Sequence, residues 1–290
     1  MSASWRFEAI GTAWEIETPE PLTEETRVAV DARIEAYDRT WSRFRDDSLV
    51  ARIGREGGSW ELPAEAGELF ELARILYDAT DGRMSPLVAA SLERLGYGPG
   101  MSLTPSGAAL PAPRWEDAIA WDGTVLQAPR PVRLDIGASG KGQLVDLVLD
   151  VLDEHGVEAA LVDASGDLRR RGDGTVRIGL EHPGDPTRVV GVAELGRAGD
   201  QWGALCASAV NRRAWGPGLH HVLDATTGIS VSRVTATWVV AETAMVADGV
   251  ATALFLTDPE RIPPALGFEF ARIVGGRIER SPGFPGEVFA

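Results

Sequence analysis

One segment of this 290-residue chain carries a carboxylate and a hydroxyl at a spacing that suits a metal ion. Asp248 and Thr252 lie four residues apart in residues 247–254, so on a helix they share one face. The rest of that run is apolar or glycine, and a packed face rarely keeps a carboxylate without a partner. These oxygen ligands suit Mg²⁺, which keeps phosphate oxygens or waters as its other ligands. The alternative is an exposed or capping Asp248 and a Thr252 that packs as valine does.

A second candidate site is the strand–turn–helix junction over residues 134–142, with the sequence Leu-Asp-Ile-Gly-Ala-Ser-Gly-Lys-Gly. Backbone N–H groups at a helix start attract phosphate, small residues permit close approach, and Lys141 adds positive charge. The spacing of the glycines and the lysine is not that of a Walker loop. The alternative is an ordinary glycine-containing turn followed by a helix with a solvated lysine.

Two further polar segments could contribute to a site. Residues 165–167, Ser-Gly-Asp, follow a buried strand, where ligand-binding groups are common, although Gly and Asp are also ordinary turn residues. Residues 220–228 begin with His220 and His221 and include Asp224. On a strand the two histidines face opposite sides, so only one could enter a site. The alternative is that the inward histidine is a hydrogen-bonded core group.

The composition excludes several classes of protein. The chain has 28 Lys and Arg against 43 Asp and Glu, a net charge of −15, and nucleic-acid binding needs a basic face. A single nucleotide ligand remains compatible with that balance. One cysteine, Cys206, cannot form an intramolecular disulfide, and the four histidines are too scattered for a zinc cage. We therefore expect no nucleic-acid partner and no zinc site.

The hydrophobicity of the chain bears on its location. No stretch approaches the roughly 20 apolar residues that a membrane helix needs. Residues 1–13 contain no apolar run of signal-peptide length. We expect a cytoplasmic protein without membrane insertion.

Hydrophobic periodicity predicts the elements that must position these groups. Residues 5–17 are expected to form a strand or hairpin, and Thr23 to cap a helix. One face of that helix carries Val30, Ile34, Tyr37, Trp41 and Phe44. We also expect helices over residues 64–80, 144–156 and 243–256, strands over 132–136, 159–162, 189–195, 204–210 and 235–241, a loop over 95–113, and a hairpin over 268–279.

The order of these elements predicts the fold class. Helices and strands are intermingled without regular βαβ alternation, which favours an α+β fold with mixed or antiparallel sheets packed with helices. We expect residues 1–290 to form a single domain, with two closely packed subdomains as the alternative.

Taken in order, the candidate segments resemble the FAD:protein FMN transferase family, the ApbE-type flavin transferases. Residues 7–12 are similar to the family's opening F-x-A-M-G-T, and residues 135–142 to its D-L-G-G-I-A-K-G. Residues 166–167, 220–228 and 247–254 resemble G-G-D, H-H-I-I-D-P-R-T-G and A-D-A-L-A-T-A-L. Residues 42–48, 80–84 and 86–88 belong to the same pattern. Each motif alone is weak, whereas the ordered set covers almost the whole chain.

The resemblance implies a T-fold-like α+β architecture with FAD in a cleft and Mg²⁺ between its phosphates and the protein. Asp248 and Thr252 would supply side-chain metal ligands, and Ala138 and Ala251 would supply backbone carbonyls. His221 would accept a proton. The residues implied at FAD are Ile10, Phe44, Arg83, Met84, Ser85, Asp135, Lys141 and Leu223.

The chain departs from the family pattern at four places. These are Ser165 for a glycine, Ala225 for a proline, Ser139-Gly140 for Ile-Ala, and Ala207-Ser208-Ala209 for a T-S-G turn. The metal pair and Lys141 are intact, so the departures bear on flavin fit and acceptor choice more than on the chemistry.

The implied reaction joins FMN to another protein. A Thr or Ser hydroxyl of an acceptor flavoprotein, recognised through a short Thr-containing motif, would attack the FMN-side phosphorus of FAD and release AMP. One alternative is a Mg²⁺-dependent FAD pyrophosphatase that yields FMN and AMP. The other is a flavin-binding protein without turnover.

Overall fold

The computed structural model describes residues 3–196 and 202–289, and its central element is an antiparallel sheet of eight strands. The strands are Ala3–Ala9 (β1), Thr12–Thr18 (β2), Ala160–Asp163 (β6), Asp167–Arg171 (β7), Ala204–Ala209 (β10), Val234–Ala241 (β13), Phe268–Val274 (β14) and Arg277–Arg280 (β15). They lie in the order β1-β2-β6-β7-β10-β13-β14-β15, and each neighbouring pair is antiparallel.

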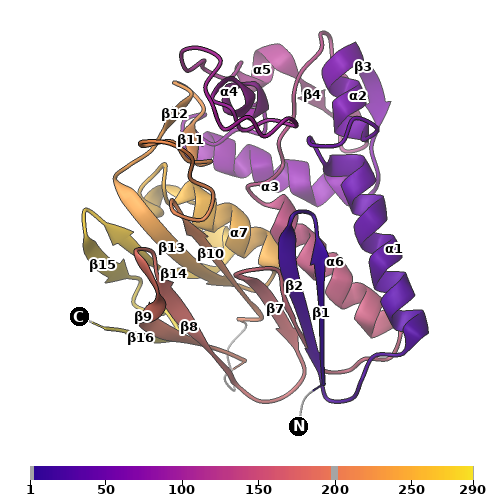
Figure 1. The fold of residues 1–290 in the computed structure, drawn as a ribbon, viewed down its shortest axis with the longest axis vertical. Coiled ribbons are helices and arrows are strands. Elements are labelled where there is room, and N and C mark those ends of the chain that lie inside the picture. The colour runs from indigo at the N-terminus through magenta and orange to yellow at the C-terminus, as the bar shows by residue number, and fades with distance from the viewer. Residues whose placement is uncertain (1–2, 197–201, 290) are drawn as a thin grey trace.

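Helices cover one face of this sheet in two layers (Figure 1). The α-helices are Glu24–Trp41 (α1), Leu49–Glu56 (α2), Ala66–Ala79 (α3), Ala89–Arg94 (α4), Trp115–Ala118 (α5), Gly140–Glu154 (α6) and Ala244–Ala253 (α7), with short 3₁₀ helices at Pro259–Arg261 and Pro264–Leu266. Helices α6 and α7 pack on the sheet, while α1 packs on α6 and α3 packs on α7. No helix among the described residues has both the length and the apolar character needed to cross a bilayer.

A smaller sheet covers the opposite face. It consists of Val176–His182 (β8), Asp185–Leu195 (β9) and Gly286–Val288 (β16), in the order β16-β9-β8. Alternate residues of β13 therefore enter two different cores: Trp238 packs with Leu180 and Leu195, and Val239 packs on the helical side. At β13 both faces of the central sheet are buried, which explains the nearly continuous apolar run of this strand.

Small elements complete the end of the molecule that carries α4 and α5 (Figure 1). Strands Gly58–Glu61 (β3), Val125–Ala128 (β5) and Ala120–Trp121 (β4) form one three-stranded sheet, and Leu223–Asp224 (β11) pairs with Ile229–Ser230 (β12). The expected loop over residues 95–113 contains neither helix nor strand and no charged residue.

Most of the predicted elements are present. The structure confirms the N-terminal hairpin as β1–β2, and Thr23 caps α1 by accepting the Thr26 N–H at 3.1 Å. The other confirmed elements are α3, α6, α7, β6, β9, β10, β13 and the β14–β15 hairpin, with shifts of a few residues at their ends. Phe44 lies beyond α1, which ends at Trp41. The α+β class with antiparallel sheets is also confirmed.

The predicted strand over residues 132–136 is wrong. Val132 and Leu134 are buried and Arg133 is exposed, so the alternation is real, but none of the described strands pairs with this segment. The Asp135 N–H instead donates to the Pro86 carbonyl at 2.7 Å, which joins this segment to another loop.

Helices α6 and α7 are held together by direct polar contacts. Asp146 Oδ1 accepts the Ala244 N–H at 2.8 Å, and Oδ2 accepts the Met245 N–H at 2.9 Å. This carboxylate therefore satisfies free donors at the start of α7, and Arg169 Nη1 donates to its Oδ1 at 2.8 Å. Gly142 allows the close approach, since a Cβ there would lie 2.1 Å from the Ala244 carbonyl oxygen.

We expect Gly142→Ala to lower the free energy of unfolding by about 1–3 kcal/mol, because the added methyl group would push α6 from α7. Gly67→Ala is the matched control, since a Cβ at that α3 glycine meets nothing within 4 Å. The control should leave stability unchanged or raise it by up to about 1 kcal/mol. Urea denaturation measures both, and equal stabilities for the two variants would contradict the packing argument.

Candidate functional site

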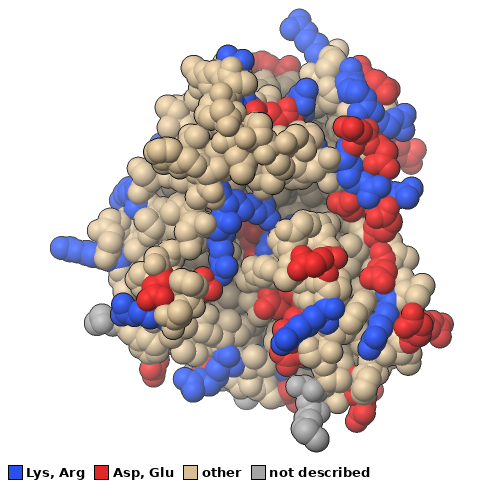
Figure 2. Space-filling model, viewed as in Figure 1, with Lys and Arg blue, Asp and Glu red and all other residues tan. Residues whose placement is uncertain are grey.

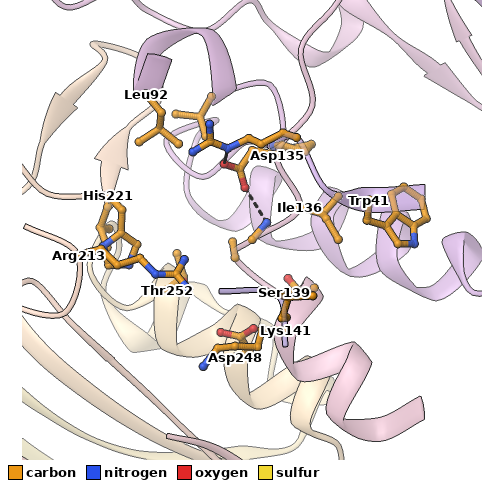
Figure 3. Close-up of a pocket in the computed structure, with 18 of the residues that line it drawn as sticks. Trp41, Leu92, Asp135, Ile136, Ser139, Lys141, Arg213, His221, Asp248 and Thr252 are labelled. Atoms are coloured by element: carbon orange, nitrogen blue, oxygen red, sulfur yellow. Dashed lines mark hydrogen bonds and ion pairs between the residues drawn. The ribbon is translucent and has the colours of Figure 1, made fainter. Parts of the chain in front are cut away.

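A cavity of about 890 Å³ lies where the β1–β2 turn, the start of α6 and one face of α7 meet. That volume is within the range of cofactor sites. Figure 3 shows Asp135, Lys141, His221, Asp248 and Thr252 around it, on segments that are far apart in the sequence. Of the residues predicted for the site, all but Arg83 and Ala251 line this cavity.

The two exceptions have other contacts. Arg83 Nη1 donates to the Leu256 carbonyl at 2.9 Å, so its side chain turns toward the end of α7. The Ala251 carbonyl, expected to face a metal, accepts the Thr237 hydroxyl at 2.9 Å. Ala251 is fully buried. The Ala251 carbonyl oxygen keeps a second lone pair, but one is already taken by the Thr237 side chain of β13.

Charged groups meet at the floor of the cavity. Lys141 Nζ donates to the Ala164 carbonyl at 2.6 Å and lies 2.8 Å from Asp167 Oδ2, although that second approach is not directed for a hydrogen bond. Lys141 is thus not the solvated lysine of the alternative interpretation. Asp248 Oδ2 accepts the Gly142 N–H at 3.0 Å. Burial, and then the negative charge of Asp167, raise the pKa of Asp248 well above its ordinary value.

The donor set around Asp248 fits a hard divalent cation. Asp248 and Thr252 share the cavity face of α7, and Ala138 lines the cavity at the junction before α6. In the part of the chain that the structure describes, no three His, Cys, Asp or Glu side chains form a metal-binding group. A metal would therefore depend on one carboxylate, a hydroxyl, a carbonyl and ligand or water oxygens, which is how Mg²⁺ is usually held. A cation there would also favour the charged carboxylate that burial disfavours.

The two histidines are separated as predicted, but not by a strand. Residue 220 makes an isolated bridge to Ala214 and belongs to no strand, so the strand assumed in comparing the two histidines is absent. His220 Nε2 contacts the Val231 carbonyl at 2.6 Å, and its Nδ1 accepts the Val222 N–H at 3.3 Å. Those contacts identify His220 as a structural, hydrogen-bonded group.

His221 lines the cavity instead. Its Nδ1 is buried and has no hydrogen-bond partner among the described residues. Burial, and then the positive charge of Arg213, lower the pKa of His221 to about 3. The imidazole is therefore neutral near pH 7.

The prediction from sequence missed a clamp around Asp135. Arg43 Nε donates to Asp135 Oδ2 at 2.6 Å, and Arg43 Nη1 donates to the Tyr97 carbonyl at 2.9 Å. The guanidinium carbon lies 4.1 Å from the Phe44 ring centroid. With Asp135 Oδ1 accepting the Gly137 N–H at 2.7 Å, the carboxylate is fixed on both sides. The signal in the sequence was the place of Arg43 directly before Phe44.

Ser165, where the family pattern has glycine, retains the backbone conformation that glycine favours. Its φ is +55°, and non-glycine residues adopt this region at an energetic cost. The Ser165 hydroxyl donates to the Ala13 carbonyl at 2.8 Å, which ties the turn to β2. Ser165 therefore adds a hydrogen-bonding side chain at a position whose backbone conformation glycine would also adopt.

Fold and cavity together define an α+β protein in which sequence motifs from both ends of the chain converge on one binding cleft. The family model described as the ApbE family matches residues 10–269. The chain belongs to the ApbE family.

Relatives and solved structures support this assignment. The chain is 28% identical over 248 residues to the FAD:protein FMN transferase of Vibrio cholerae serotype O1, covering 80% of this chain and 73% of that protein. It is 24% identical over 282 residues to the FAD:protein FMN transferase of Klebsiella pneumoniae, covering 90% and 77%. The fold is similar to the flavin transferase ApbE from Vibrio cholerae, with a TM-score of 0.81, 22% identity and 98% of each chain covered. It is also similar to the ApbE protein of Thermotoga maritima, with a TM-score of 0.82, 22% identity, and 99% of this chain and 100% of that chain covered.

The burial of His221 predicts a specific dependence of stability on pH. The folded pKa of about 3 lies below the ordinary 6.5, so below pH 6.5 the unfolded chain takes up a proton that the folded chain does not. The free energy of unfolding should fall as the pH drops from 7 toward 4, by at most about 3 kcal/mol from this group.

His221→Asn removes this dependence, so its free energy of unfolding should lose less between pH 7 and pH 4 than that of the unmodified protein. Urea denaturation at several pH values measures the difference. His155→Asn is the control of the same kind at an exposed position. Parallel pH curves for His221→Asn and the unmodified protein would show that His221 is not desolvated.

Proposed function

We propose that this protein is a Mg²⁺-dependent FAD:protein FMN transferase. It attaches FMN through a phosphoester bond to a Thr or Ser of an acceptor flavoprotein and releases AMP. The observation that carries the proposal is the convergence of the family motifs, from Ile10 to Thr252, on one cavity. The names of its relatives in Vibrio cholerae and Klebsiella pneumoniae support the same activity.

Three residues of the cavity can each contribute to a different part of this reaction. Asp135, held by Arg43 and the Gly137 N–H, presents a fixed wall on which FAD would be oriented. Lys141 places positive charge at the start of α6, where phosphate is favoured. His221 is neutral and lines the cavity, so it would take the proton of the acceptor hydroxyl.

A bound phosphate also alters the basicity of His221. A pKa of about 3 describes the protein alone, and negative phosphate oxygens near the ring would raise it. His221 thus becomes a better base when the substrate is in place.

Mg²⁺ held by Asp248, Thr252 and the Ala138 carbonyl would neutralise charge on the pyrophosphate. The Asp248 carboxylate is positioned for this by the Gly142 N–H and by the capped start of α7. The fit of the oxygen donor set, described above, is what supports magnesium rather than a softer metal.

The reaction itself is tested with FAD, Mg²⁺ and candidate flavoproteins co-expressed with this chain. Mass spectrometry should find an acceptor with one added FMN, and chromatography should find one AMP for each FMN transferred. AMP release without any acceptor would instead support a FAD pyrophosphatase. A stable flavin spectrum without AMP release would support a flavin-binding protein, and either result would overturn the proposed transfer.

His221→Asn should lower the single-turnover rate of AMP release by about 10²–10⁴-fold, which is the usual contribution of a general base. FAD affinity should change little, because the proton acceptor is not a phosphate ligand. His220→Asn is the control, since His220 is engaged with the Val231 carbonyl away from the cavity wall. A larger loss in His220→Asn, or no loss in either variant, would remove the role of His221.

Asp248→Asn tests the metal site by Mg²⁺ titration calorimetry of the FAD-bound protein. An asparagine keeps an oxygen that can accept the Gly142 N–H and removes the charge, so the fold should stay intact while Mg²⁺ affinity falls at least tenfold. Asp163→Asn is the control, because burial likewise raises the pKa of Asp163 but the residue does not line the cavity. Unchanged Mg²⁺ affinity in Asp248→Asn would exclude this residue as a ligand.

A further inference from the structure

Arg213 is a cavity residue that none of the family motifs quoted above includes. It lies in the turn that follows β10, is only partly exposed, and lines the cavity opposite α7. Figure 3 shows its side chain extending from beside His221 toward Thr252 and Asp248. The Arg213 carbonyl accepts the His221 N–H at 3.2 Å, so the backbone holds the two residues together.

The cations that line the cavity differ in how they are neutralised. Four of them lie close to a carboxylate: Arg43 at 2.6 Å from Asp135, Arg45 at 3.0 Å from Asp38, Lys141 at 2.8 Å from Asp167, and Arg212 at 3.0 Å from Glu181. Arg213 has no carboxylate oxygen within 4.0 Å among the residues described. A positive group that is partly removed from water without an anion is costly, so this cavity favours an anionic ligand.

Arg213 also lies near both functional ends of the site. Its charge is the second cause, after burial, of the low pKa of His221. Its side chain extends toward Thr252 and Asp248, the expected metal ligands (Figure 3). A phosphoryl group on which His221 and the metal both acted would therefore lie within reach of Arg213.

We propose that Arg213 binds the pyrophosphate of FAD at the FMN-side phosphoryl group and stabilises the charge that develops there during transfer. A guanidinium group suits phosphate because its planar fork can donate two hydrogen bonds to the oxygens. The proposal rests on the proposed function for the transfer step, whereas the contact between Arg213 and phosphate requires only that FAD binds in this cavity.

In the step that Arg213 assists, one bond forms and one bond breaks at the FMN-side phosphorus. The acceptor hydroxyl oxygen forms a bond to the FMN-side phosphorus, and the bond from that phosphorus to the bridging oxygen breaks. AMP leaves with the electron pair of that bond, and the hydroxyl proton goes to His221. Negative charge on the phosphoryl oxygens and the departing oxygen is what Arg213 stabilises.

The contact is tested first by binding, with FAD and riboflavin as the two probes in flavin-fluorescence titrations. Arg213→Gln should weaken FAD about 10- to 100-fold, the worth of a charge-assisted hydrogen bond. Riboflavin affinity should not change, because riboflavin has no phosphate. Arg213→Lys should fall between Arg213→Gln and the unmodified protein, since it keeps the charge and loses the fork.

Arg212→Gln is the matched control, because the neighbouring arginine lies against Glu181. Its FAD affinity should stay within about fivefold of the unmodified protein, which is the scale of a surface ion pair. Equal loss of FAD and riboflavin affinity in Arg213→Gln would overturn the proposal and identify a packing role. The same loss in Arg212→Gln as in Arg213→Gln would also overturn it.

The transfer step is tested by single-turnover AMP release at saturating FAD and a co-expressed acceptor. Arg213→Gln should be about 10²–10³-fold slower, and added guanidinium ion should restore part of that rate, which a packing defect would not allow. An unchanged rate would overturn the role in transfer. If the unmodified protein binds FAD through Arg213 but releases no AMP with any acceptor, the proposed function fails while the phosphate contact stands.

Discussion

The approach of α6 to α7 is the constraint on which the rest of the site depends. Gly142 brings the two helices together, and the Asp146 carboxylate closes the contact by capping α7. Lys141 stands on one side of this junction and Asp248 on the other, so both side chains reach the same cavity. One short segment of each helix therefore both packs the two helices together and places a side chain in the cavity.

The distribution of charge in the cavity follows from that geometry (Figure 2). In a chain with a net charge of −15, basic side chains nevertheless reach the hollow on the face shown in Figure 2, and most of them are balanced by nearby carboxylates. Burial shifts the pKa values of two cavity groups in opposite directions: it raises that of Asp248 and lowers that of His221. Both are therefore biased toward their uncharged forms until an anion or a cation enters.

Local sequence patterns could predict a large part of this arrangement. Periodic apolar residues identified α1 and α3, and the ordered motifs identified most residues of the cavity wall, because these signals lie within a few positions along the chain. Residues 132–136 misled the prediction, since alternate burial does not reveal whether a neighbouring strand exists. The hydrogen bond from the Thr237 hydroxyl to the Ala251 carbonyl joins β13 to α7, which meet only in the folded chain, so no local pattern signals it.

The order of strands in the central sheet constrains how the chain can fold during its synthesis. Strand β2 pairs with β6, with Glu15 opposite Asp163, so the N-terminal hairpin is synthesised long before its partner strand. Until then the aromatic rings of Trp5, Phe7 and Trp14 have no sheet to join, and such non-local pairing is slow and prone to aggregation. The cavity is completed later still, when α7 has left the ribosome. A ligand of this cavity can therefore stabilise the finished protein but cannot guide the early stages of its folding.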